Sequence, residues 1–290
     1  MVYEDFLPAL VVVLGLVVGS FLNVVIFRLP KIMDRQWRVE CQQYLQSDVN
    51  ASVDFSSKHD EPVFNLAYPR SHCGQCAHVL RWYENIPVLS YCFLRGRCSA
   101  CGAKISLRYP VVELLTAFVF GWLFQRWGLG WTFAAWVVFS VLLLCLAFID
   151  WDTTLLPDDL TYPLLWSGLL AANFSWIAVS LSSALMGAAI AYLFLWSIFW
   201  IFKWITGKEG MGYGDFKLFA ALGAWFGVEA LLPLILISSI FGIVVAVILK
   251  FRSSLRAGGY VPFGPFLAFA GFALMMLDLN GFFKIFHLGF

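Results

Sequence analysis

Long apolar runs alternate with short polar segments over most of the chain, and one long polar stretch interrupts them. A helix that crosses a bilayer needs about 20 mostly apolar residues. Runs of this kind occupy residues 6–27, 111–127, 130–149, 160–179, 183–205, 216–228, 230–249 and 261–284. The pattern therefore predicts an all-α polytopic membrane protein with about eight transmembrane helices. The second and sixth runs are short, and the sixth and seventh meet at 227–229 with little room for a loop.

The long polar stretch predicts a separate domain between the first two helices. We accordingly divide the chain into a first transmembrane helix at 1–27, a polar domain at 28–110 and a membrane core of seven helices at 111–290. Within the polar domain, residues 48–60 are rich in Ser, Asp and Asn, and we expect a mobile loop there. The first apolar run follows acidic residues and not a basic segment, so we expect a retained helix and not a signal peptide.

Composition and charge support a membrane protein and give its orientation. Hydrophobic residues make up 61% of the chain and charged residues 13%, whereas roughly a quarter of the residues of soluble domains are charged. Most Lys and Arg residues lie in 28–110 or in the loops at 203–217 and 250–260, leaving Arg126 and Lys284 on the other side. By the positive-inside rule, the polar domain faces the cytoplasm. The net charge of +1 gives no reason to expect a nucleic-acid partner.

Four cysteines of the polar domain form two CxxC motifs. Cys73-Gly-Gln-Cys76 is followed, after 21 residues, by Cys98-Ser-Ala-Cys101. This spacing is typical of a tetrahedral Zn²⁺ site, with Gly74 and Gly102 easing the tight turns. A redox pair or a disulfide is the alternative, although a cytoplasmic location argues against a stable disulfide. Because four cysteines leave no open coordination position, we expect a structural metal.

One aspartate lies between two apolar runs, at the end of Gly210-Met211-Gly212-Tyr213-Gly214-Asp215. An ionised carboxylate at membrane depth costs several kcal/mol unless it is partnered or hydrated. The glycines permit a positive φ or a close approach to another segment. Taken alone, this segment is equally compatible with a flexible loop between helices.

A second acidic segment ends the third apolar run with Asp150-Trp-Asp152 and continues to Pro157-Asp158-Asp159. The predicted topology places Asp150 and Asp152 at the same membrane face as Asp215. Two neighbouring aspartates can divide their roles, because one stays protonated as an acid while the other activates water as a base. The alternative is a solvated acidic turn, which is our interpretation of Asp158 and Asp159.

Three further polar residues lie near membrane ends. Asn23 and Arg28 occupy the end of the first run, where Asn23 can bond across helices and Arg28 can extend to the interface. The alternative is that both line a substrate or cofactor pocket. Glu113 lies just inside the second run, with Arg108 as a possible partner, and an intramembrane carboxylate is a functional candidate by default. Pocket function and a structural ion pair remain equally open for Glu113.

The motif Gly212-Tyr213-Gly214-Asp215 resembles the GxGD signature of intramembrane aspartyl proteases, which presenilins, signal peptide peptidases and type IV prepilin peptidases share. The remaining motifs resemble only the last family and keep its order over nearly the whole chain. They are GSFLNVVIFRLP at 19–30, the two CxxC motifs, RYPVVE at 108–113, the Asp150 segment and PFGPF at 262–266. In the family a catalytic aspartate precedes a proline by seven positions, and Asp150 and Pro157 match this spacing better than Asp152 does.

The resemblance implies a bifunctional enzyme of the bacterial inner membrane. Such enzymes cut the basic leader from prepilins and type II secretion pseudopilins at the cytoplasmic face. They then methylate the new amino terminus, usually Phe, with S-adenosylmethionine. The catalytic pair would be Asp150 and Asp215, and the substrate-binding or loop-shaping residues Gly212, Gly214, Glu113, Asn23 and Arg28. No glycine-rich dinucleotide fingerprint marks the S-adenosylmethionine site, and the oligomeric state is open. A non-enzymatic membrane scaffold or transporter with a zinc adaptor is the alternative function.

Overall fold

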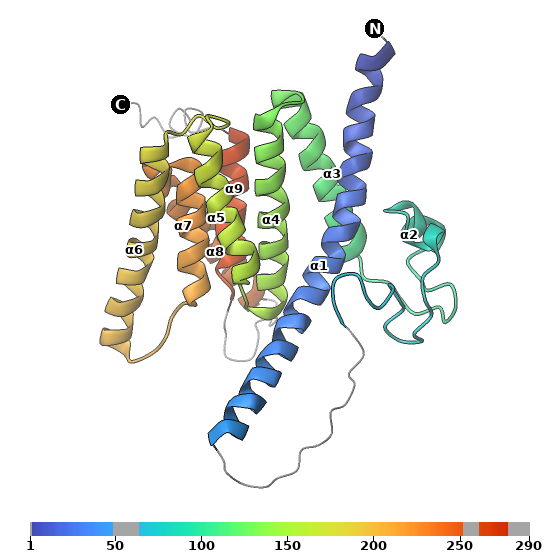
Figure 1. Ribbon diagram of the computed structural model, residues 1–290, viewed down its shortest axis with the longest axis horizontal. Coiled ribbons are helices and arrows are strands. Elements are labelled where there is room, and N and C mark those ends of the chain that lie inside the picture. The colour runs from blue at the N-terminus through green and yellow to red at the C-terminus, as the bar shows by residue number, and fades with distance from the viewer. Residues whose placement is uncertain (1, 49–63, 252–260, 278–290) are drawn as a thin grey trace. The chain divides into compact units, whose positions relative to one another are not determined.

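The computed structural model describes residues 2–48, 64–251 and 261–277, and the chain forms two compact units, residues 1–121 and 122–290. Its helices are α1 (Val2–Asp48), α2 (Leu89–Phe93), α3 (Arg108–Trp127), α4 (Trp131–Thr153), α5 (Asp158–Asn173), α6 (Leu181–Thr206), α7 (Tyr213–Phe226), α8 (Leu231–Phe251) and α9 (Gly264–Leu277), with 3₁₀ turns at Trp82–Asn85 and Val228–Ala230 (Figure 1). The described residues form two isolated β-bridges and no strand. The all-α class is therefore confirmed.

Each of the eight predicted apolar runs overlaps one helix of the structure. Four segments are long and apolar enough to cross a membrane: Phe6–Leu45, Trp131–Thr153, Leu181–Thr206 and Val228–Phe251. The apolar helix α9 is shorter, and α7, with 14 residues, is about 21 Å long, less than the roughly 30 Å of a hydrocarbon core. The described residues thus contain four candidate membrane spans, and the count of eight spans stays a prediction.

The first helix is longer than its apolar run. The helix continues through Pro30 to Asp48, while the membrane boundary expected at residue 27 stays a prediction. Lys, Arg, Gln and Glu in its polar part are good helix formers, and Arg38 pairs with Asp34 one turn earlier at 3.0 Å. The loop expected at 48–60 lies, apart from its first residue, outside the described residues.

In unit 1, two glycines bring α1 close to α3. A Cβ atom on Gly15 would lie 2.7 Å from Cα of Ala117, and one on Gly19 would lie 2.7 Å from Cα of Glu113. Small residues spaced by four allow two membrane helices to approach backbone to backbone. This contact places residues 19–23 of α1 beside the first turns of α3.

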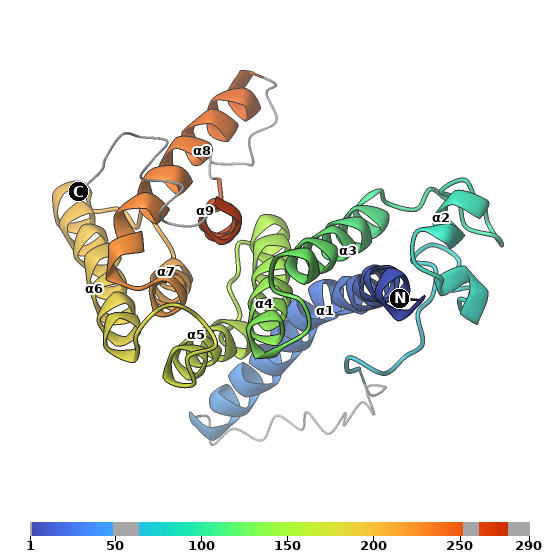
Figure 2. The same ribbon diagram turned by 90° about the horizontal axis from the view of Figure 1, so that it is seen from above.

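In unit 2, α7 is the central helix. It packs against α5, α6 and α9, while α4 packs against α5 and α9 (Figure 2). Trp136 and Phe139 of α4 contact Trp225 of α7 in an aromatic core, with ring centroids 5.2 and 5.0 Å apart. The tight junction expected after α7 is a 3₁₀ turn at Val228–Ala230, preceded by Gly227 at φ +76°. Glycine adopts this conformation without a Cβ clash.

Candidate functional site

Asp150 and Asp215 occupy helix ends in unit 2. Asp150 lies in the last turn of α4 and Asp215 in the first turn of α7, and each is only 4% exposed. Their charges interact, so the two carboxyl groups belong to one buried site. Asp152, by contrast, is exposed.

Asp215 is held by the start of its own helix. The backbone N–H of Gly212 donates to Oδ2 of Asp215 at 3.1 Å, and the N-terminus of a helix favours negative charge. The other oxygen, Oδ1, is buried and has no hydrogen-bond partner among the described residues. A buried carboxylate oxygen of this kind is available to a water molecule or a substrate group.

Close packing explains the glycines around the two aspartates. A Cβ on Gly214 would lie 2.7 Å from Cβ of Leu156, and a Cβ on Gly264 would lie 2.5 Å from Oδ2 of Asp150. No positive φ occurs at Gly212 or Gly214, so close approach is what the structure requires of Gly214. Gly264 was not among the predicted site residues, although its motif, PFGPF, was noted in the sequence.

An ion pair connects two helix starts near Asp215. Nζ of Lys217 on α7 lies 2.7 and 2.8 Å from the two carboxylate oxygens of Asp158 on α5. The same ammonium group is 5.3 Å from the ring centre of Tyr162. The interpretation of Asp158 as part of a solvated turn is therefore wrong. Its partner, Lys217, lies 59 positions away in the sequence, so no local pattern indicated the ion pair.

The four predicted zinc ligands converge in unit 1. The sulfur atoms of Cys73, Cys76, Cys98 and Cys101 all lie within 4.8 Å of one another, and two of the pairs are 3.9 and 4.0 Å apart. Zn–S bonds of about 2.3 Å in a tetrahedron require sulfur separations of about 3.8 Å. The cluster therefore fits a structural Zn²⁺ ion.

The two CxxC knuckles have the same backbone geometry. The N–H of Cys73 donates to His78 O at 2.9 Å, and that of Cys98 donates to Ala103 O at 2.8 Å. Ala77 and Gly102 occupy the equivalent positive-φ positions, at 56° and 70°. The expectation for Gly74 is thus wrong, because the strained position follows the second cysteine. Backbone N–H groups of Cys76 and Gln75 lower the pKa of the Cys73 thiol to about 6, whereas the neighbouring cysteine side chains raise the pKa of Cys76 to about 12.

Glu84 joins the two knuckles. Its carboxylate accepts hydrogen bonds from the Arg81 N–H at 2.8 Å and the Ser99 hydroxyl at 2.5 Å, and it lies 3.3 Å from Nε2 of His78. The Arg81 N–H and the Ser99 hydroxyl hold the pKa of Glu84 below its usual value. The sequence analysis missed this residue, and no spacing rule would have found it.

Asn23 and Arg28 hold backbone segments in unit 1. Nδ2 of Asn23 donates to Tyr109 O across the helix contact at 3.1 Å. The guanidinium of Arg28 donates to the carbonyls of Asn65, Leu66 and Pro69 at 3.0, 3.2 and 2.6 Å. Both side chains are buried, so Arg28 organises a folded loop and does not simply extend to the interface.

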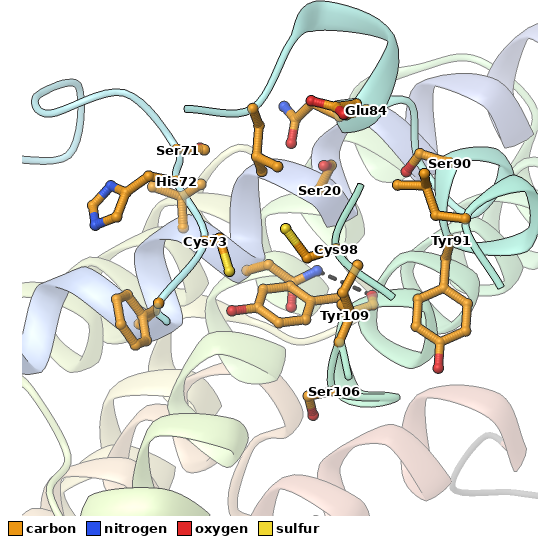
Figure 3. Close-up of a pocket in the computed structure, with 18 of the residues that line it drawn as sticks. Ser20, Ser71, His72, Cys73, Glu84, Ser90, Tyr91, Cys98, Ser106 and Tyr109 are labelled. Carbon is orange, nitrogen blue, oxygen red and sulfur yellow. Dashed lines mark hydrogen bonds between the residues drawn. The ribbon is translucent and has the colours of Figure 1, made fainter. Parts of the chain in front are cut away.

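Glu113 is also buried, at 7% exposure. Its Oε2 accepts a hydrogen bond from the Val88 N–H at 2.8 Å, and Ser20 is its second hydrogen-bonding neighbour. The pairing of Glu113 with Arg108 stays a prediction. Glu113, Asn23 and Arg28 line one cavity in unit 1, whose other walls include the cysteine knuckles (Figure 3).

Two protein-family models match the chain, one in each half. A model of the bacterial peptidase A24 N-terminal domain matches residues 13–127, and a model of the type IV leader peptidase family matches residues 137–247. No solved structure matches the chain significantly.

Three curated relatives, each named prepilin leader peptidase/N-methyltransferase, are similar over nearly the whole chain. The Pseudomonas aeruginosa protein is 46% identical over 265 residues, which are 91% of this chain and 88% of the relative. The Aeromonas hydrophila protein is 47% identical, covering 92% and 90%, and the Neisseria gonorrhoeae protein 43%, covering 94% and 91%. The resemblance drawn from the sequence motifs is confirmed, and the chain belongs to the type IV leader peptidase family.

Proposed function

We propose that this protein cleaves the leader from prepilins and type II secretion pseudopilins and then methylates the new amino terminus. The names of its relatives support both reactions, and they argue against the alternative of a non-enzymatic scaffold. The observation that carries the proposed mechanism is the buried, interacting pair of Asp150 and Asp215.

In the proposed cleavage step the two aspartates share one proton, because two neighbouring buried carboxylates do not both ionise readily. The ionised carboxylate takes a proton from water, and the resulting hydroxide attacks the carbonyl carbon of the scissile bond. The protonated carboxyl group supplies the proton that the leaving amine needs. The buried Oδ1 of Asp215, without a partner among the described residues, offers a position for the water molecule.

Both reactions are proposed for the cytoplasmic face of the inner membrane. The concentration of Lys and Arg in residues 28–110, 203–217 and 250–260 supports this orientation. S-adenosylmethionine supplies the methyl group when it is bound. The chain must orient the new amino terminus and accept its proton, since positioning accounts for much of the rate of such transfers.

The dyad is tested with purified protein and a prepilin substrate. Asp150→Asn and Asp215→Asn should each lower the cleavage rate by at least about 10³-fold, because either change removes a proton acceptor or donor from the reaction. Asp152→Asn is the matched control, since that carboxylate is exposed, and it should keep substantial activity. Normal cleavage by either dyad variant would refute the mechanism.

A further inference from the structure

A short turn joins α4 to α5 close to the proposed dyad. It consists of residues 154–157, because α4 ends at Thr153 and α5 begins at Asp158, and Asp150 lies in the last turn of α4. The starts of α7 and α9 lie at the same end of unit 2 as this turn (Figure 1). Three segments that are distant in the sequence therefore approach one another near the residues proposed for catalysis.

Leu156, in this turn, faces two glycines. A Cβ atom on Gly214 would lie 2.7 Å from Cβ and 3.2 Å from Cδ1 of Leu156, and a Cβ on Gly264 would lie 3.3 Å from the same Cδ1. Gly214 directly precedes Asp215 on α7. Gly264 begins α9, and a Cβ there would lie 2.5 Å from Oδ2 of Asp150. One leucine side chain thus packs against the two backbone positions that adjoin the two carboxyl groups.

The backbone on both sides of Leu156 is held by its own turn. The N–H of Thr154 donates to Asp150 O at 2.8 Å and closes the end of α4. Pro157 follows Leu156, and a residue before proline is largely confined to extended conformations. The carbonyl of Pro157 accepts hydrogen bonds from the N–H and the hydroxyl of Thr161, at 3.0 and 2.9 Å, at the start of α5. The turn itself therefore sets the direction of the Leu156 side chain.

We propose that Leu156 is a positioning residue for leader cleavage, which sets the spacing between the starts of α7 and α9 and so the separation of Asp150 and Asp215. The ion pair of Lys217 with Asp158 joins α7 to the residue that follows the turn, so α7 is held to the turn by charge and spaced from it by the leucine. Protein interiors are close-packed, and a change of even one methylene is felt by the neighbouring segments. The inference rests on the proposed dyad and adds a residue that acts through it.

The first measurement is cleavage of a prepilin substrate by the full-length protein in lipid nanodiscs. Leu156→Ala should lower kcat by about 10- to 100-fold, because a displacement of about 1 Å in a catalytic group can cost about 100-fold in rate. KM should stay unchanged, since the leucine acts on the carboxyl groups and not on the substrate. Leu156→Met conserves the volume and should retain most of the rate. Leu155→Ala, at the neighbouring half-buried leucine, is the matched control and should cleave like the wild-type protein.

The second measurement reports the spacing without cleavage. The chain carries Asp150→Cys and Asp215→Cys, and the cysteines outside the metal cluster are replaced by alanine. Dibromobimane becomes fluorescent when it joins two neighbouring thiols, and this reaction should be about tenfold slower with Leu156→Ala than with Leu156→Met, because it depends on proximity. Melting temperatures show whether each variant is folded. Leu156→Val removes the Cδ1 atom that faces Gly264 and keeps Cβ, so it replaces the alanine variant if that variant is unstable.

Three results would overturn the assignment of Leu156. They are equal cross-linking rates in the alanine and methionine variants, equal losses of kcat in Leu155→Ala and Leu156→Ala, and a raised KM with unchanged kcat in Leu156→Ala. Normal cleavage by Asp150→Asn or Asp215→Asn would instead refute the proposed dyad. The cross-linking rates would then still decide whether Leu156 sets the spacing of the two positions.

Discussion

Buried charges in the two units have different surroundings. In unit 1, Arg28 donates to three backbone carbonyls and Glu113 accepts from the Val88 N–H, so these charges organise loops around a cavity. In unit 2, Asp150 and Asp215 place two carboxyl groups at one buried site, and one oxygen of Asp215 has no partner among the described residues. Charges with hydrogen-bond partners stabilise the surrounding backbone, whereas two neighbouring carboxyl groups that cannot both ionise are suited to proton transfer. We therefore expect a substitution that disrupts the buried charges of one unit to leave the activity that depends on the other unit unchanged.

The largest expected effect is loss of the metal from unit 1. Cys98→Ser should abolish Zn²⁺ binding, because structural sites use all four ligands, and the folding energy tied to such a site is on the order of 10 kcal/mol. Amide hydrogen exchange over residues 71–106 should become fast, because the two CxxC segments lose the metal that would hold them together. Cys41→Ser, outside the cluster, is the control. Unchanged metal content in Cys98→Ser would remove the zinc assignment.

A smaller effect, confined to unit 2, is expected from Gly264→Ala. The new methyl group would lie 2.5 Å from Oδ2 of Asp150, so α9 or the carboxylate must shift. A displacement of about 1 Å in a catalytic group can cost about 100-fold in rate. Gly130→Ala is the control, because nothing lies within 4 Å of a Cβ at that position. Cleavage kinetics should separate the two variants, and equal rates would show that Asp150 tolerates the shift.

The smallest expected effect concerns the pair of Lys217 and Asp158. Lys217→Met removes a partly exposed ion pair, and such pairs contribute about 0.5–1 kcal/mol, so cleavage should slow by about two- to fivefold. Lys217→Arg should retain most of the rate. A double-mutant cycle with Asp158→Asn tests the coupling directly. Additive effects of the two single variants would show that the pair does not position Asp215.

Local motifs were predicted well because their geometry depends on neighbouring residues. The CxxC spacing predicted the cysteine cluster, since each knuckle is closed by hydrogen bonds over five positions. The structure buries Asp150 and exposes Asp152, and the assignment of Asp150 as the catalytic residue, made from the spacing to Pro157, stays a prediction. Gly264 and Glu84 escaped prediction because their contacts join segments that are distant in sequence or follow no periodic pattern.

The sequence by itself determined the helical class, the approximate helix positions, the cysteine cluster and the family. The length of an apolar run and the spacing of metal ligands are local properties, which depend only on residues close together in the sequence. Only the tertiary structure decided that α1 continues to Asp48, that Asp158 pairs with Lys217, and that Glu113 and the knuckles share a cavity. These features depend on helix packing and on which backbone groups remain to satisfy a buried charge. A buried charge is paired with whichever polar group lies nearest in the folded structure, and that group can be distant in the sequence.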